Sequence, residues 1–358
     1  MRRGRQKGPR HRPFVAAGVF ACALAIFALG VGQLVGLARC EVFTRRIEAL
    51  DRNAKASGPA VPLNASWSFA FGDSACKIEV PVLQSELDYA RNIDTKAVFR
   101  SGGKLREDYV VRLARAQSQS AFIDRLSTEL REVKRARALD DDGYLDLLVR
   151  AVQSIPFGSR GARMRLPVEV VASGYGVCSE KSFLLAALML HEGYDTAFWW
   201  LETQNHVAPG VAIDGPDFRD SGYAFIETTR VAYIGEVSAT NRAAGPIAKP
   251  PRLIRLGGTK PYGAGEKVAY ILGVLERAEA INKKLARYMS SLAAAPRGSG
   301  QLLAAAQAER QSAWQRISYL RGQSDEPAAA YAFLVKSDAT PALLRRIDVP
   351  DARTDAMP

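Results

Sequence analysis

The stretch GYGVCSEKSFLLAALMLHEGY, residues 174–194, places one cysteine between a glycine turn and an apolar run. Apolar residues recur through 183–190 at the spacing of a buried helical face, so we expect a helix that begins near Cys178. Backbone N–H groups without helical partners, together with the helix dipole, favour a thiolate at such a position. Cys178 is therefore a candidate nucleophile; the competing interpretation is a small buried apolar residue.

A nucleophilic cysteine needs a base within hydrogen-bond reach, and the chain contains three histidines. His11 lies in the basic N-terminal tail. His191 ends the predicted cysteine helix, about 20 Å from Cys178 at 1.5 Å per residue. His206, at the start of the apolar segment HVAPGVAID (206–214), is the candidate base by elimination. The alternative is a structural histidine at the start of a strand.

The third group of such a site is an acid that orients the base. In YAFIETT, residues 223–229, Phe225 and Glu227 share one face of a predicted strand. A charge inside an apolar strand needs a partner, which makes Glu227 the candidate acid, unless it pairs with an arginine instead. Asp214 is the rival, but it lies at the far end of His206's own predicted strand and is typical of a turn.

The surrounding pattern indicates an α+β protein. WSFAF (67–71) and IEVPV (78–82) alternate with period two and predict a hairpin with an aromatic face. Residues 107–155 have helical spacing, interrupted by the acidic turn DDDG at 140–143. Strands are expected at 197–202, 206–214 and 223–229. Trp199 and Trp200 are neighbours in the first of these strands, so they face opposite ways and are expected to pack in the core.

The order and wording of these segments resemble the transglutaminase-like superfamily, and more narrowly its prokaryotic branch. The resemblance rests on GVCSEKSFLLAALMLHEGYD (176–195), HVAPGV (206–211) and YAFIETT (223–229), and it covers about residues 65–237. It implies a papain-like α+β core in which a helix bearing the cysteine packs on an antiparallel sheet. It also implies that Cys178 is the nucleophile, His206 the base and Glu227 the acid. Two positions depart from the family pattern: the acid is usually Asp, and Ser179-Glu180 stand where Glu-Asp is usual.

The N-terminus predicts a membrane anchor. Residues 1–12 carry six positive side chains and no acid, and so account for half of the formal net charge of +12. Residues 14–38 then carry no charged side chain and are long enough to cross a bilayer. We expect a cytoplasmic tail at 1–12, one transmembrane helix at 13–38 and a translocated remainder. A cleaved signal peptide is the alternative, although Arg39 stands where a small residue is wanted.

The rest of the chain divides around the core. We expect a stalk at 39–64, the core domain with its N-terminal hairpin and helices at 65–240, and a Pro/Gly-rich linker at 241–265. An apolar stripe predicts a helical hairpin at 266–322, a possible partner-binding element, followed by a tail at 323–358.

Two classes of function remain open from the sequence. The first is an anchored cysteine acyltransferase or hydrolase that acts on amide bonds of exported proteins or peptides. The second is a catalytically inactive scaffold or binding module, which a Cys76–Cys178 disulfide would favour. We expect no cofactor, no metal and no nucleic acid partner, because the cysteines and histidines are scattered and no basic stripe with spaced aromatic residues occurs.

Overall fold

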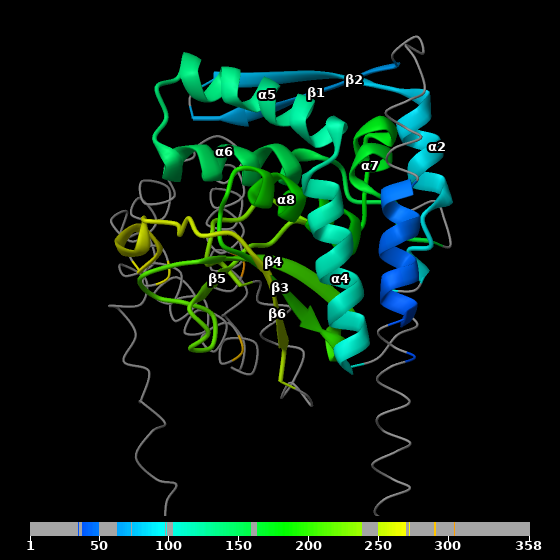
Figure 1. Ribbon diagram of the computed structural model, residues 1–358. Coiled ribbons are helices and arrows are strands. Elements are labelled where there is room, and N and C mark those ends of the chain that lie inside the picture. The colour runs from blue at the N-terminus through cyan, green and yellow to red at the C-terminus, as the bar shows by residue number, and fades with distance from the viewer. Residues whose placement is uncertain are drawn as a thin grey trace, which may run out of the picture.

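The computed structural model describes residues 38–49, 63–72, 74–96, 98, 103–158, 163–237 and 250–269, with the single positions 35, 272, 290 and 304. These residues form an α+β fold with two antiparallel sheets, as predicted (Figure 1). The helices are α2 (Gln84–Asn92), α4 (Gly103–Ser118), α5 (Ala121–Ala136), α6 (Asp141–Ser154), α7 (Pro167–Ser173) and α8 (Cys178–His191). The strands are β1 (Leu63–Phe71), β2 (Ser74–Val82), β3 (Thr196–Leu201), β4 (His206–Ala212), β5 (Tyr223–Phe225) and β6 (Arg252–Gly257), and the 3₁₀ turn η1 spans Glu202–Gln204.

Helix α8 is the centre of the fold. All nine residues from Lys181 to Met189 are buried, so every side of this part of the helix is covered. The helix packs against α4, α5, α6, α7 and the strands β3 and β4. A helix that is apolar on every side is stable only when it is surrounded. Figure 1 shows α8 between the hairpin side of the molecule and the four-stranded sheet. The segment quoted first therefore organises the core.

The four-stranded sheet has the order β5-β4-β3-β6, and every neighbouring pair is antiparallel. One face packs on α8, where the Ser182 hydroxyl donates to the Val207 carbonyl at 2.9 Å. Trp200 belongs to this main core, whereas Trp199 packs in a second cluster with Leu201 and Phe225. The expectation that both tryptophans pack and face opposite ways is therefore confirmed.

The β1–β2 hairpin matches the predicted one, with Trp67 opposite Ile78 in its register. Buried side chains alternate along both strands and pack toward α5 and α6. The Trp67 indole N–H donates to the Ala151 carbonyl at 3.1 Å, which joins the hairpin to α6. The predicted acidic turn at 140–143 is the beginning of α6, because Asp140 caps the helix by accepting from the Gly143 N–H at 2.7 Å.

Part of the stretch predicted as a linker at 241–265 is the edge strand β6. Its sequence RLIRLG alternates, with Ile254 and Leu256 buried, and it pairs with β3. The prolines before it and the glycines after it dominated the sequence pattern. They flank the strand rather than interrupt it, which is the arrangement that prolines and glycines tolerate.

Part of the stretch predicted as a stalk at 39–64 is helical. Residues 38–49 form a helix whose buried side chains are Cys40, Phe43 and Ile47. The Phe43 ring meets Tyr109 of α4 edge to face at 4.9 Å. These apolar residues recur at helical spacing, and the helix packs along α4 rather than standing away from the domain (Figure 1).

Several predicted segments lie outside the described residues. These are the basic tail 1–12, nearly all of the anchor 13–38, most of the helical hairpin 266–322 and the tail 323–358. Within the described part of the chain, no helix combines the length and the apolar character that crossing a membrane requires.

Candidate active site

Cys178 is the first residue of α8, as predicted, and a tight turn leads to it. Gly174 ends α7 with φ +71°, a left-handed conformation that suits glycine. A Cβ on Gly176 would lie 3.0 Å from the Lys181 side chain and 3.1 Å from that of Val170, so the turn packs closely on α7 and α8. Gly176 also bridges to Phe157, which fixes the turn against the segment that follows α6.

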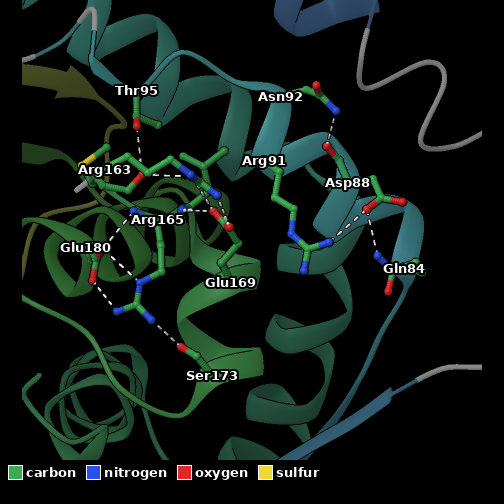
Figure 2. Close-up of polar contacts among 12 residues, drawn as sticks. Gln84, Asp88, Arg91, Asn92, Thr95, Arg163, Arg165, Glu169, Ser173 and Glu180 are labelled. Atoms are coloured by element: carbon green, nitrogen blue, oxygen red, sulfur yellow. Dashed lines mark hydrogen bonds and ion pairs between the residues drawn. The ribbon is translucent and has the colours of Figure 1, made fainter. Parts of the chain in front are cut away.

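Glu180 holds this turn in place from inside the helix. Its Oε2 accepts from the Val177 N–H at 3.0 Å and from Arg165 Nη2 at 2.7 Å, and its Oε1 accepts from the Arg165 backbone N–H at 2.9 Å. The Glu180 side chain is 2 % exposed. Arg165 also lies over the Tyr175 ring and donates to the Tyr175 carbonyl at 3.0 Å. Figure 2 shows Arg165 directed at both Glu180 and Ser173.

The same arrangement recurs at two other helix starts. Glu169 accepts from the Leu166 N–H at the beginning of α7 and pairs with Arg163, also drawn in Figure 2. Glu86 accepts from the Leu83 N–H at the beginning of α2 and pairs with Arg125. Glu180 is thus a helix-capping anchor, a structural role that accounts for an acid at this position without a catalytic function.

His206 is the first residue of β4, opposite Leu201 in the ladder with β3. The chain reverses just before it through η1 and Asn205, whose φ of +47° is left-handed. The imidazole Nε2 lies 3.4 Å from Glu227 Oε2. This separation and its alignment fall short of a hydrogen bond, so the contact is an ion pair when the ring is protonated. Catalytic contacts are often this loose without substrate.

Strand β5 ends at Phe225, not at the predicted residue 229, so Glu227 lies in the turn just after the strand. Its Oε1 accepts from the Thr228 and Thr229 N–H groups, each at 2.9 Å, and from the Thr229 hydroxyl at 2.8 Å. These backbone donors are therefore turned toward the carboxylate and leave the strand ladder. The side chain folds back onto its own turn, which takes up the extra methylene that distinguishes Glu from Asp, and Oε2 remains directed at His206.

The charges of the three side chains support one another. Burial opposes ionisation of the Cys178 thiol, but hydrogen bonding and attraction to His206, with N–H groups of Val207 and Ser179, lower its pKa. Burial likewise opposes protonation of His206, but its contacts with Cys178 and Glu227 raise its pKa to about 9. The Glu227 pKa is lowered against its burial by His206 and by Thr229. These shifts favour a thiolate–imidazolium pair with a carboxylate behind it.

No family model, curated protein or solved structure matches this chain. The chemistry of the site therefore follows from its own side chains. A thiolate at a helix start is a nucleophile, and an imidazolium beside it can protonate a leaving group. Such a group of three residues suits acyl transfer through a thioester.

The other candidates lie elsewhere. His191 Nδ1 is 2.8 Å from the Ser118 carbonyl oxygen, at the far end of α8 from the thiol. Asp214 follows β4 at the end opposite His206. Cys76 and Cys178 are both free thiols. Among the described residues, no group of three or more His, Cys, Asp and Glu side chains is arranged to hold a metal ion.

Sequence reasoning missed two buried polar residues near the site, Gln153 and Lys181. Gln153 is 5 % exposed and Lys181 is fully buried. A signal was present for Lys181, because a lysine in the run EKSFLLAALML interrupts an otherwise apolar helix.

Proposed function

We propose that this protein is a transglutaminase-like cysteine acyltransferase or hydrolase with a papain-like core. The observation that carries the proposal is the chain of Cys178, His206 and Glu227, in which the thiol begins α8 and the imidazole lies between thiol and carboxylate. Glu227 orients the ring, since its Oε2 faces Nε2 and leaves Nδ1 for the thiol.

The reaction begins when the Cys178 thiolate attacks an amide carbonyl and a C–S bond forms. The imidazolium of His206 gives its proton to the amide nitrogen, the C–N bond breaks and an amine or ammonia leaves. Water or a second amine then gives a proton to neutral His206 and attacks the thioester. The C–S bond breaks, and the thiolate–imidazolium pair is restored with the product of hydrolysis or amide exchange. Glu227 stays ionised throughout and stabilises the imidazolium.

The N-terminal pattern supports a location, and with it a class of substrate, for the proposed enzyme. A basic tail at 1–12 and an uncharged run at 13–38 favour an anchored protein whose core faces the outside of the cytoplasmic membrane. Its substrates are then exported proteins or peptides. A transglutaminase-like fold supports both hydrolysis and amide exchange with the same residues.

An electrophilic thiol probe tests the proposal. We expect an alkyne-bearing chloroacetamide to label the full-length wild type at Cys178 and to leave Cys178→Ala unlabelled. Cys76→Ala is the matched control, because Cys76 is also free but buried, and it should label like the wild type. Equal labelling of the wild type and Cys178→Ala contradicts the proposal.

The inactive binding module predicts a different result. In that case His206→Ala leaves the labelling rate at pH 6.5 unchanged, because the histidine has no effect on the thiol. Acyl transfer requires the rate to fall.

A further inference from the structure

Lys181 is a buried cation on the cysteine helix, one turn beyond the nucleophile. Its side chain has no exposed surface. The ammonium donates to the carbonyls of Gln153 at 3.1 Å and Ile155 at 2.6 Å, at the C-terminal end of α6. Within the described residues no carboxylate lies at ion-pair distance from it. Burying a charge is costly, so a lysine in this place needs a compensating charge nearby.

Gln153 connects the same end of α6 to the turn that holds Glu227. Its Nε2 donates to the carbonyls of Glu227 at 2.7 Å and Ala232 at 2.8 Å, and its Oε1 accepts from the Ala232 N–H at 3.3 Å. Lys181 therefore binds the backbone of the residue whose side chain fixes the Glu227 turn. The two buried polar residues join α8, α6 and the acid of the site into one network.

The acid whose charge acts on Lys181 is Glu227. Burial lowers the Lys181 pKa to about 8, and attraction to Glu227 opposes that decrease. The acids of the ion pairs on the other elements around Lys181 already have cationic partners: Glu169, Glu180 and Glu236 pair with arginines, and Asp141 and Asp146 of α6 pair with lysines. The buried charged groups on those elements include Arg150 on α6 and the acids of the pairs Arg163–Glu169 at α7, Arg165–Glu180 at α8 and Arg230–Glu236 after β5.

We propose that Lys181 is a positioning residue for the proposed reaction: its ammonium is the counter-charge of Glu227, and its bonds to α6 fix the turn on which Glu227 lies. This inference rests on the proposed function. Charges then alternate along the buried chain from Lys181 to Glu227, His206 and Cys178. The net charge of the four side chains is zero when thiolate and imidazolium face each other. It is zero again when the thiol is acylated and His206 is neutral, because the charges of Lys181 and Glu227 then cancel. Both states of the reaction avoid a net buried charge.

Removal of the lysine charge has a defined consequence for His206. Without the Lys181 ammonium, the negative charge of Glu227 is no longer offset, so the protonated form of His206 is favoured and the His206 pKa rises. As a general scale, a unit charge that acts over about 10 Å at an effective dielectric constant of about 20 shifts a pKa by about one unit. A merely structural lysine predicts a loss of stability without such a shift.

The experiment is an NMR titration of full-length protein labelled with ¹³C in the histidine rings. The chain has three histidines, and the signal lost in His206→Ala identifies the one of interest. We expect the His206 midpoint to rise by about one pH unit in Lys181→Met. Gln153→Met is the matched control, because it removes buried hydrogen bonds and keeps the lysine charge; loosening of the Glu227 turn can only lower the His206 midpoint, so no rise is expected. An unchanged midpoint in Lys181→Met, or an equal rise in Gln153→Met, overturns the proposal.

A second variant tests the same link from the other end. In Glu227→Gln the lysine loses its counter-charge, so the Lys181 midpoint, followed by ¹³Cε of labelled lysine, should fall by about one pH unit. A constant Lys181 midpoint overturns the proposal even if Lys181→Met does not fold. Neither titration needs a substrate, so failure here is distinct from failure of thiol labelling at Cys178.

Discussion

Replacement of His206 by alanine should slow alkylation of the Cys178 thiol at low pH and have a smaller effect at high pH. In the wild type the imidazole lowers the thiol pKa against the effect of burial. In His206→Ala the burial remains and the imidazole is gone. The thiol then returns to an ordinary or raised pKa, and little thiolate is present below pH 7.

The size of the effect follows from the ionised fraction and the reactivity of each thiolate. A thiol with an ordinary pKa of about 8.5 is roughly 1 % ionised at pH 6.5, so full ionisation in the wild type gives at most about a 100-fold gain. Nucleophilicity falls about threefold for each tenfold gain in ionisation. The net difference at pH 6.5 is therefore at most about tenfold. The difference shrinks as pH rises above 9, where His206 has lost its proton and no longer stabilises the thiolate.

The assay is iodoacetamide alkylation of the full-length chain between pH 5.5 and 9.5, with the Cys178 peptide quantified by mass spectrometry. Cys40 and Cys76 serve as internal controls, since both are buried and should react slowly in either protein. A wild-type to variant ratio that stays constant with pH, or that is near one at pH 6.5, refutes the proposed coupling of thiol and imidazole.

Three further outcomes are expected. Glu180→Gln should lower the free energy of unfolding by about 2–3 kcal/mol in chemical denaturation, because it removes a buried charge-assisted anchor, whereas the exposed ion-pair residue Glu132→Gln should change it by less than about 0.5 kcal/mol. The Glu227 pKa is lowered in the folded protein, so the ionised side chain stabilises the fold above the unfolded-state pKa near 4.5, and this stabilisation is lost as pH falls toward the folded-state pKa of about 2. The difference in free energy of unfolding between the wild type and Glu227→Gln should therefore shrink from about 3 kcal/mol at pH 6 toward zero near pH 2. Gly258→Ala should lower the free energy of unfolding by more than about 3 kcal/mol, because the added Cβ lies 2.0 Å from a backbone oxygen. Gly193→Ala is also at positive φ but in open space, and should lower it by about 1 kcal/mol. Similar melting temperatures for the two variants would contradict the close approach beyond β6.

Local patterns predicted the elements whose burial is regular. Helix α8 is apolar on every side, and β1, β2, β3 and β4 alternate or are continuously apolar, so period and length were sufficient. Strand β6 and the helix at 38–49 were missed because flanking Pro, Gly and charged residues outweighed short apolar repeats. Their stability comes from neighbours distant in sequence, namely β3 and α4, and a local window contains no information about those partners.

The candidate site was predictable for a different reason, because it lies where the local pattern fails. A glutamate after an apolar strand was singled out for this reason, and a lysine within the apolar run of α8 carried the same signal but was missed. Lys181 and Glu227 are each expensive to bury alone, and the fold keeps both within one connected polar network. The partners were not predictable, since the bond from Lys181 to the α6 carbonyls joins residues 26 and 28 positions apart. A sequence therefore reveals which buried charges need a partner, and the packing of α6 against α8 determines which partner each receives.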